Sequence, residues 1–337
     1  MIGRALLTAA TVGAVIAVIV LLIVMFSGGD SSDPLPPVDL PAAAVRDGID
    51  VGSDPVAAAV GAGGVWVLDA AKGTLSRVDP DTRRVAGRPA RVDGGPFAVA
   101  VGEGAVWVAS TDGTVRAFDP RTMEPTGRAA QVRGANGLAV GLGGVWVTSR
   151  LAGTLTRIDP ATRRVDPPIR VGAGPADVAV GAGAVWVANA DAGSVSRVDP
   201  GSGRADAPIA VGTQQVRALA VGEDGVWVAR AGGRVGDRLE VVRIDPRERE
   251  LDGEPVPVPG AVPLDMAAAG GSVWITDAGG LPGSRPGGVS RLDPRARRLA
   301  GTLLTGDRPS AVAVGENGAW VTNAGDGTLT PISVGGR

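Results

Sequence analysis

Residues 171 to 210 read VGAGPADVAVGAGAVWVANADAGSVSRVDPGSGRADAPIA and contain one tryptophan, Trp186. Similar units surround each of the seven tryptophans of the chain, which stand 39 to 47 residues apart at Trp66, Trp107, Trp146, Trp186, Trp227, Trp274 and Trp320. A period near 40 residues is typical of helical arrays or of propeller blades, so the pattern inside the unit must decide between them.

The unit is built from short β-branched segments bounded by glycine or proline, such as residues 185–187 and 194–198. It has no 3.6-residue apolar spacing long enough for a helix. Each unit predicts four antiparallel strands: a ends in Ala-Val-Gly, b carries the tryptophan, c ends in Val-Asp-Pro and d leads to the next unit. Strand b is apolar on both faces, so we expect the tryptophans between neighbouring blades. The sequence therefore predicts an all-β, seven-bladed β-propeller of four-stranded antiparallel blades over residues 42–337.

The two ends of the repeat region indicate a closed ring. The last unit stops after strand c, around residues 327–333, and has no strand d. The missing strand is predicted before the first unit, because VRDGIDVG at residues 45–52 aligns without a gap with VDPPIRVG at residues 165–172. Pairing these segments would remove two exposed sheet edges. Pro331 stands where most strands c carry arginine, so we expect imperfect pairing there.

The amino-terminal region predicts a membrane anchor. Residues 5–26 carry no charge and are long enough to span a bilayer as a helix. A cleaved signal peptide is the alternative, but the apolar stretch is too long for one and no A-x-A pattern follows it. Arg4 precedes this segment and Asp30 follows it, which places residues 1–4 in the cytoplasm. With residues 27–41 as a proline-rich linker, we expect a single-pass cell-membrane protein with an extracytoplasmic propeller.

The composition narrows the possible functions. The chain has no cysteine, no histidine and no tyrosine, and its 33 basic and 35 acidic residues give a net charge of −2. Histidine is the commonest general base and the commonest transition-metal ligand, so its absence disfavours an enzyme. We expect no cofactor and no metal, and the acidic balance gives no reason to expect a nucleic-acid partner.

Segments such as residues 185–189 (VWVAN) and 319–323 (AWVTN), with the recurring Val-Asp-Pro, resemble the YVTN/YncE-like family of seven-bladed propellers, related to NHL-type and streptogramin-lyase-like propellers. The resemblance covers about residues 45 to 337. It implies the fold but not the function, because the family includes enzymes and binding modules. The chemistry of streptogramin lyases depends on histidine and a divalent metal, and this chain has no histidine to take that role.

Three recurring features have structural interpretations. The glycines after strand a, as at residues 61–64, predict tight hairpins. The six Asp-Pro pairs, as at residues 159–160, predict turns in which the aspartate bonds the turn backbone. The strand-c arginines predict solvated or salt-bridged blade edges; they are Arg77, Arg157, Arg197, Arg243 and Arg291.

Candidate ligand residues stand where the repeat varies. The position three residues after each tryptophan, expected on one face around the central channel, is occupied by Asp69, Ser110, Ser149, Asn189, Arg230, Asp277 and Asn323. The longer b-to-c connections of blades 5 and 6 are expected on the same face; they carry Arg234, Asp237, Arg238 and Arg285. Asp177 and Asp265, at the start of strand a, are expected to point toward the channel and help bind a cation or amine, with turn capping as the alternative.

We therefore predict a non-catalytic binding or scaffolding module for a protein, peptide or envelope ligand, and assign no catalytic residue. The alternative is a metal-dependent lyase or hydrolase that uses acidic groups such as Asp177, Asp265 or Asp277 with oxygen ligands for Mg²⁺ or Ca²⁺.

Overall fold

The computed structural model describes residues 43–212, 215–231, 239–258, 263–279, 286–316 and 318–334. The predicted membrane helix and the linker, residues 5–26 and 27–41, lie outside these ranges. Within the ranges, no helix is long and apolar enough to cross a membrane.

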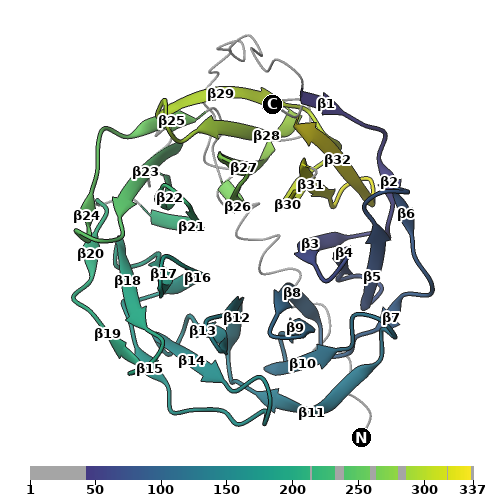
Figure 1. Cartoon of the computed structure of the whole chain (residues 1–337), viewed down its shortest axis with the longest axis horizontal. Coiled ribbons are helices and arrows are strands. Elements are labelled where there is room, and N and C mark those ends of the chain that lie inside the picture. Colours follow the sequence, from purple (N-terminus) through teal and green to yellow (C-terminus); the bar gives the residue numbers. More distant parts are fainter. Residues whose placement is uncertain are drawn as a thin grey trace, which may run out of the picture.

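The described residues form seven antiparallel sheets arranged around a central opening (Figure 1). This confirms the all-β, seven-bladed propeller. Strand a of every blade is nearest the centre; these strands are β3 (Pro55–Gly61), β8 (Pro96–Gly102), β12 (Ala135–Gly141), β16 (Pro175–Gly181), β21 (Gln215–Gly222), β26 (Pro263–Ala269) and β30 (Pro309–Gly315).

Strands b and c follow outward in each blade. The b strands are β4 (Gly64–Asp69), β9 (Ala105–Ser110), β13 (Gly144–Ser149), β17 (Ala184–Asn189), β22 (Gly225–Ala231), β27 (Ser272–Gly279) and β31 (Gly318–Asn323). The c strands are β5 (Thr74–Asp79), β10 (Thr114–Phe118), β14 (Thr154–Ile158), β18 (Ser194–Asp199), β23 (Leu239–Asp245), β28 (Pro286–Asp293) and β32 (Thr328–Val334).

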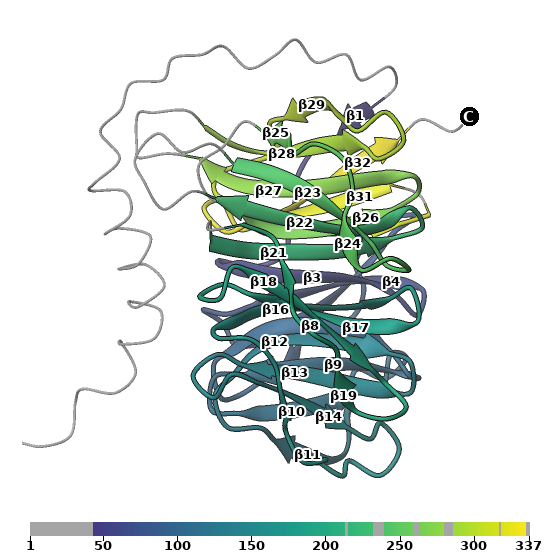
Figure 2. The ribbon, with the colours of Figure 1, turned by 90° about the vertical axis from the view of Figure 1, so that its left-hand side faces the viewer.

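The outermost strand d is often split into two short pieces. In blades 1 to 6 it comprises β6 (Arg84–Val85) with β7 (Ala90–Arg91), β11 (Pro125–Gln131), β15 (Ile169–Arg170), β19 (Arg204–Ala205) with β20 (Ile209–Ala210), β24 (Glu250–Leu251) with β25 (Val256–Val258), and β29 (Arg298–Leu303). Figure 2 shows the ring edge on, as a short cylinder. One face carries the d-to-a connections and b-to-c turns and is called the mouth face below; the other carries the a-to-b hairpins and c-to-d turns.

The predicted ring closure is confirmed. Two strands from the start of the described chain, β1 (Ala43–Val45) and β2 (Ile49–Asp50), pair with β32. Val45 lies opposite Ile332, and Ile49 lies opposite Leu329. The register between β31 and β32 is continuous through Pro331. On the other side of β32 the strand pairing is interrupted between Val45 and Ile49, opposite Pro331, so the expected disturbance is present there. The outer edge of β32 is therefore covered by strands from the start of the described chain.

The tryptophans lie in the core between blades, as predicted. Their exposed fractions range from 0 to 4%. Trp186 of blade 4, for example, belongs to one apolar cluster with Val216 and Val228 of blade 5. Its indole N–H donates to the carbonyl of Gly181 in the a-to-b hairpin at 3.1 Å. Each tryptophan of this kind thus holds its own hairpin and fills the space against the next blade.

The Asp-Pro turns and the strand-c arginines also behave as predicted. In blade 3, the backbone N–H groups of Thr162 and Ala161 donate to Asp159 and hold the pKa of this carboxyl below its usual range. The Arg157 guanidinium lies 6.0 Å from the centre of the Trp146 ring and 3.0 Å from the Asp166 carboxylate. The other Asp-Pro turns repeat the N–H donation to aspartate. Among the described residues, Arg197 repeats both arginine contacts, whereas Arg77 and Arg291 repeat only the tryptophan contact and Arg243 only the ion pair, with Asp252.

Candidate binding site at the channel mouth

The polar residues at the ends of strands b lie inside the fold, and not on an open face as the sequence suggested. Asp69, Ser110 and Ser149 have exposed fractions of 1 to 3%. The Asp69 carboxylate accepts from the N–H of Ser53 at 2.5 Å and of Lys72 at 2.8 Å. The hydroxyls of Ser110 and Ser149 each donate to a carbonyl of the preceding connection at 3.0 Å.

The other residues at the ends of strands b also face the interior of their blades. The amide nitrogens of Asn189 and Asn323, both fully buried, donate to hydroxyls of strand c in their own blades. Arg230 pairs with Glu240 at 2.8 Å, and Asp277 is 4% exposed. The expected accessibility is thus wrong for the six buried side chains, whereas Arg230 is partly buried. Asp69, the two serines, the two asparagines and Arg230 turn toward their own blade to bond the adjacent connection or strand.

The predicted residues of the long connections cannot be placed in the same way. Arg234, Asp237, Arg238 and Arg285 lie outside the described residues, so their ligand role stays a prediction.

Asp177 and Asp265 lie at matching β-bulges of β16 and β26, where the strands begin on the mouth face. Asp177 accepts from its neighbour Val178 at 2.8 Å and from the N–H of Leu219 in the next blade at 2.9 Å. Asp265 does the same with Met266 at 2.8 Å and Val312 at 2.9 Å. Both carboxylates therefore bridge innermost strands of adjacent blades, and this capping role is the alternative raised by the sequence.

These two carboxyl groups are unusually hard to ionise. Burial raises the pKa of Asp177 to about 6, against the lowering effect of its two N–H donors. Burial, and then the negative charge of Asp177, raise the pKa of Asp265 to about 7. The two groups therefore interact electrostatically and are partly protonated near neutral pH. A cationic group beside them would favour their ionised forms.

A second set of residues at the same bulges was missed by the sequence reasoning. The bulge residue of strand a is different in every blade: Val56, Phe97, Asn136, Ala176, Arg217, Leu264 and Ser310. None of these residues is fully buried, in contrast to the strand-b ends of every blade except blade 5, where Arg230 is partly buried. Because all seven innermost strands begin on the mouth face, these residues form a ring around the channel entrance, called the bulge ring below.

The bulge ring combines apolar and polar groups. Asn136 donates to the carbonyl of Pro175 in the next blade at 2.9 Å, and Ser310 donates likewise to Pro55 at 2.6 Å. Arg217 donates to Gln215, and burial lowers its pKa. The variation of this position was visible in the sequence, but the bulge that exposes it was not. Bulges of this kind re-aim side chains near functional sites.

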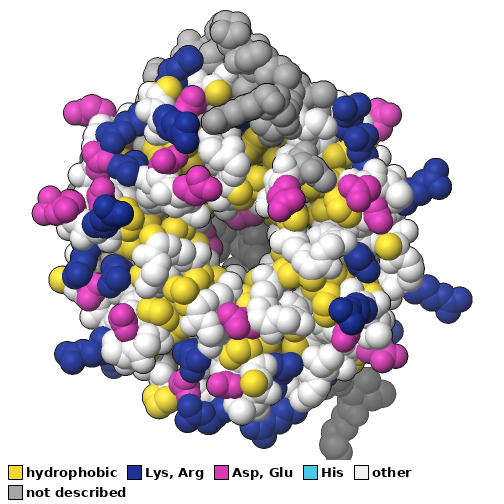
Figure 3. All heavy atoms as spheres, viewed as in Figure 1, with side chains coloured by type: hydrophobic (Ala, Val, Ile, Leu, Met, Phe, Trp, Pro, Cys, Tyr) yellow, Lys and Arg dark blue, Asp and Glu magenta, His cyan; other side chains and the backbone are white. Residues whose placement is uncertain are grey.

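Charge is distributed unevenly over the ring. Figure 3 shows one face, on which most Lys and Arg side chains lie toward the outer rim, while apolar, uncharged and a few acidic side chains lie around the central opening. Among the described residues, no group of three or more acidic side chains is arranged to hold a metal ion.

No protein-family model and no curated protein sequence matches this chain. Solved structures similar to it include a streptogramin B lyase, with 16% identity over 86% of this chain and 97% of the other and a TM-score of 0.72. Hydrazine synthase of Kuenenia stuttgartiensis gives 16% identity over 85% and 97%, with a TM-score of 0.74. Virginiamycin B lyase of Staphylococcus aureus gives 15% identity over 86% and 99%, with a TM-score of 0.70.

Another similar structure is a catalytically inactive virginiamycin B lyase in which a histidine is replaced by alanine. This chain has no histidine. Because all these identities are low and the named proteins differ in activity, the similarity establishes a seven-bladed propeller and no more.

Proposed function

We propose that this chain is a non-catalytic, membrane-anchored, extracytoplasmic binding module whose ligand, a protein, peptide or envelope component, docks on the mouth face. The bulge ring is the observation that carries this proposal. The positions that the fold needs are repeated in every blade, as with the seven tryptophans, whereas the bulge position holds seven different residues around one opening. Varied side chains on a rigid scaffold are typical of recognition surfaces.

Asp177 and Asp265 suggest which part of the ligand would enter the channel. Their carboxyl groups lie one residue beyond the bulge ring along β16 and β26. A ligand amine or other cation would be attracted to them in their ionised forms, while the apolar bulge residues Val56, Phe97 and Leu264 would contact its uncharged part. The predicted anchor, residues 5–26, would hold the module at the cell membrane.

The test is capture of envelope components by the full chain in detergent micelles. The mouth variant combines Phe97→Ala, Arg217→Ala and Leu264→Ala, since alanine already stands at this position as Ala176. The control variant combines Glu103→Ala and Leu142→Ala on the opposite face, where Ala62 and Ala182 show that alanine fits the same left-handed hairpin position.

We expect the same component to be enriched by the wild type and the control variant, and to be lost with the mouth variant. Equal capture by all three proteins, with unchanged thermal midpoints, would show that the mouth face is not the recognition surface.

A second candidate is acid–base chemistry by Asp177 and Asp265, favoured by their raised pKa values of about 6 and about 7. In this form the protein would be a metal-dependent lyase or hydrolase with oxygen ligands only. A shift of the thermal midpoint with Mg²⁺ or Ca²⁺ that disappears in Asp265→Ala would support it, and indifference to both ions would argue against it.

A further inference from the structure

The fifth residue of each Asp-Pro turn has a left-handed backbone conformation and follows a common pattern. It is Arg83, Met123, Arg163, Gly203, Arg249 and Arg297 in blades 1 to 6, with φ values from 50 to 66°. Four of these six residues are arginines, although left-handed φ values normally favour glycine. The arginines therefore have a role that outweighs the backbone cost.

That role is to fill the groove toward the preceding blade. Arg163 of blade 3 lies over the Trp107 ring of blade 2, 4.4 Å from its centre. Met123 of blade 2 packs against the apolar cluster that contains Trp66 of blade 1.

The later blades fill the groove through ion pairs. Arg249 of blade 5 lies 3.5 Å from the Asp206 carboxylate of blade 4, and Arg297 of blade 6 lies 2.5 Å from Asp252 of blade 5. The side chain of the turn residue thus reaches the preceding blade in each of these four cases.

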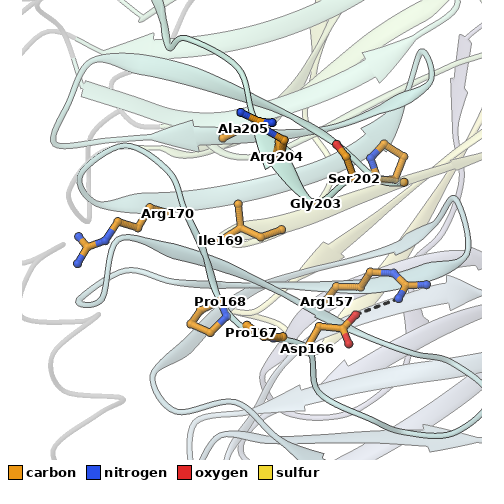
Figure 4. Close-up of a pocket in the computed structure, with 12 residues that line it drawn as sticks. Arg157, Asp166, Pro167, Pro168, Ile169, Arg170, Ser202, Gly203, Arg204 and Ala205 are labelled. Atoms are coloured by element: carbon orange, nitrogen blue, oxygen red, sulfur yellow. Dashed lines mark hydrogen bonds and ion pairs between the residues drawn. The ribbon is translucent and has the colours of Figure 1, made fainter.

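The junction between blades 3 and 4 is different, because Gly203 has no side chain to fill it. A groove of about 610 Å³ lies there, bordered by β15 and β19 (Figure 4). Figure 4 shows Ile169 in the middle of this groove, with Arg170 on its left and the Arg157–Asp166 ion pair to its lower right. At the neighbouring junctions the side chain of the turn residue occupies the equivalent space. Here that space is free to accept one side chain of a ligand.

The charges of the groove select its occupant. Asp166 is the one carboxylate among the lining residues, and it already pairs with Arg157 at 3.0 Å and with Arg164 at 2.9 Å. Arg170 and Arg204 also line the groove, are exposed, and form no ion pair with any described residue. The lining thus has an excess of positive charge, which disfavours a cationic ligand and attracts carboxylates.

We propose that the groove between blades 3 and 4 binds an acidic peptide segment of a partner protein, with one apolar side chain in the space left by Gly203. That side chain would contact Ile169 and Pro168, and carboxylates on either side of it would pair with Arg170 and Arg204. The site is independent of the mouth face.

The key variant, Gly203→Arg, closes the groove with the residue that four equivalent turns carry. The backbone is compatible, because Gly203 has φ 66° and Arg163 has φ 63°. The nearest atom to a Cβ at position 203 is Ile169 Cδ1 at 3.7 Å, which is ordinary contact distance. Arg170→Ala removes the positive charge together with the side chain that carries it and leaves Gly203 unchanged; Ala210 is the equivalent residue of blade 4. The mouth variant serves as the matched control.

The experiment selects binders from a phage library of random 12-residue peptides on the full chain in detergent micelles, then measures their affinity by fluorescence anisotropy. We expect peptides rich in Asp and Glu around an apolar residue. Their affinity should fall at least about tenfold in Gly203→Arg, fall less in Arg170→Ala, and stay unchanged in the mouth variant.

Three outcomes would overturn the proposal: no selected peptide that distinguishes wild type from Gly203→Arg, selection of basic peptides, or equal affinity for wild type and Arg170→Ala. Thermal midpoints of all variants exclude loss of folding as the cause, and Arg170→Ala decides the question if Gly203→Arg does not fold. If the capture experiment on the mouth face failed, the peptide affinities of the groove would not change. The proposed function and the groove proposal can therefore be refuted independently.

Discussion

The tryptophan of strand b has three functions at one position. It fills the space between blades, bonds its own hairpin through the indole N–H in blades 1 to 4, and in blades 1, 3, 4 and 6 lies under the strand-c arginine. Burial between blades is the contact that all seven tryptophans share. The single tryptophan of each unit therefore predicts how the blades pack against one another as well as how many blades there are.

Replacing Trp186 with alanine should lower the free energy of unfolding by about 3–5 kcal/mol, because a large buried side chain leaves a cavity that the sheets cannot close. Urea denaturation of the full chain in detergent micelles would measure this. Leu151→Ala is the control, since Leu151 is 98% exposed and its loss should change little. A cost below about 1 kcal/mol for Trp186→Ala would contradict the packing described.

The channel carboxyls make a pH-dependent contribution to stability. Their pKa values of about 6 and about 7 exceed the ordinary value of 3.8, so the folded protein keeps protons that the unfolded chain releases. Their stabilising contribution is complete below about pH 4 and is lost as the pH rises to about 7. For Asp177 the loss is about 3 kcal/mol at most.

Denaturation at a series of pH values, in the wild type and in Asp177→Ala with Asp265→Ala, would test this sign. Alanine suits the position, as Ala57 and Ala311 show in other blades. Between pH 5 and 8 the wild type should lose stability relative to the variant. The Asp-Pro aspartates, whose pKa values are lowered, act in the opposite direction below about pH 4 and are common to both proteins. Parallel profiles would refute the assignment.

At the scale of strands, the sequence predicts the pattern but not the direction of every side chain. The glycine hairpins, the Asp-Pro turns and the short β-branched segments between them identify strands a to c because each depends on local backbone chemistry. The ends of strands b were misplaced for a physical reason: whether Asp69 or Asn189 faces solvent depends on a connection that folds over it.

The bulge of strand a shows the other limit. One extra residue between Pro175 and Asp177 shifts the register against strand b and re-aims the side chain at position 176. Nothing in the local sequence requires this shift, since the bulge position holds seven different residue types. The groove beside Gly203 could not be predicted from the sequence either, because it is recognised only by comparison with the side chains that the equivalent turns place against the preceding blade.

At the scale of the whole molecule, the ring closes within blade 7, whose strands come from both ends of the described chain. Circular permutation would test how much this shared blade contributes to thermal stability, because it removes no strand. Ala43 pairs with Val334, so a short Gly-Ser linker would join these ends. Opening the chain between Pro120 and Arg121 recreates a shared blade at blade 2, whereas opening between Gly94 and Gly95 leaves every blade built from one continuous segment.

We expect the first permutant to unfold at a temperature at least about 5 °C higher, because backbone pairing holds its ends whereas side-chain packing alone holds the ends of the second. Differential scanning fluorimetry would measure both. Equal midpoints would mean that packing between blades is sufficient to close the ring.

The shared blade has a consequence for synthesis. Val45 leaves the ribosome 287 residues before Ile332, its partner in the last sheet. At roughly 5–20 residues per second, the first strand waits about 15 to 60 s with its hydrogen-bonding edge unpaired. During this interval the first strand of one nascent chain can also pair with the last strands of another, so we expect strand-exchanged dimers to increase when many chains are translated close together.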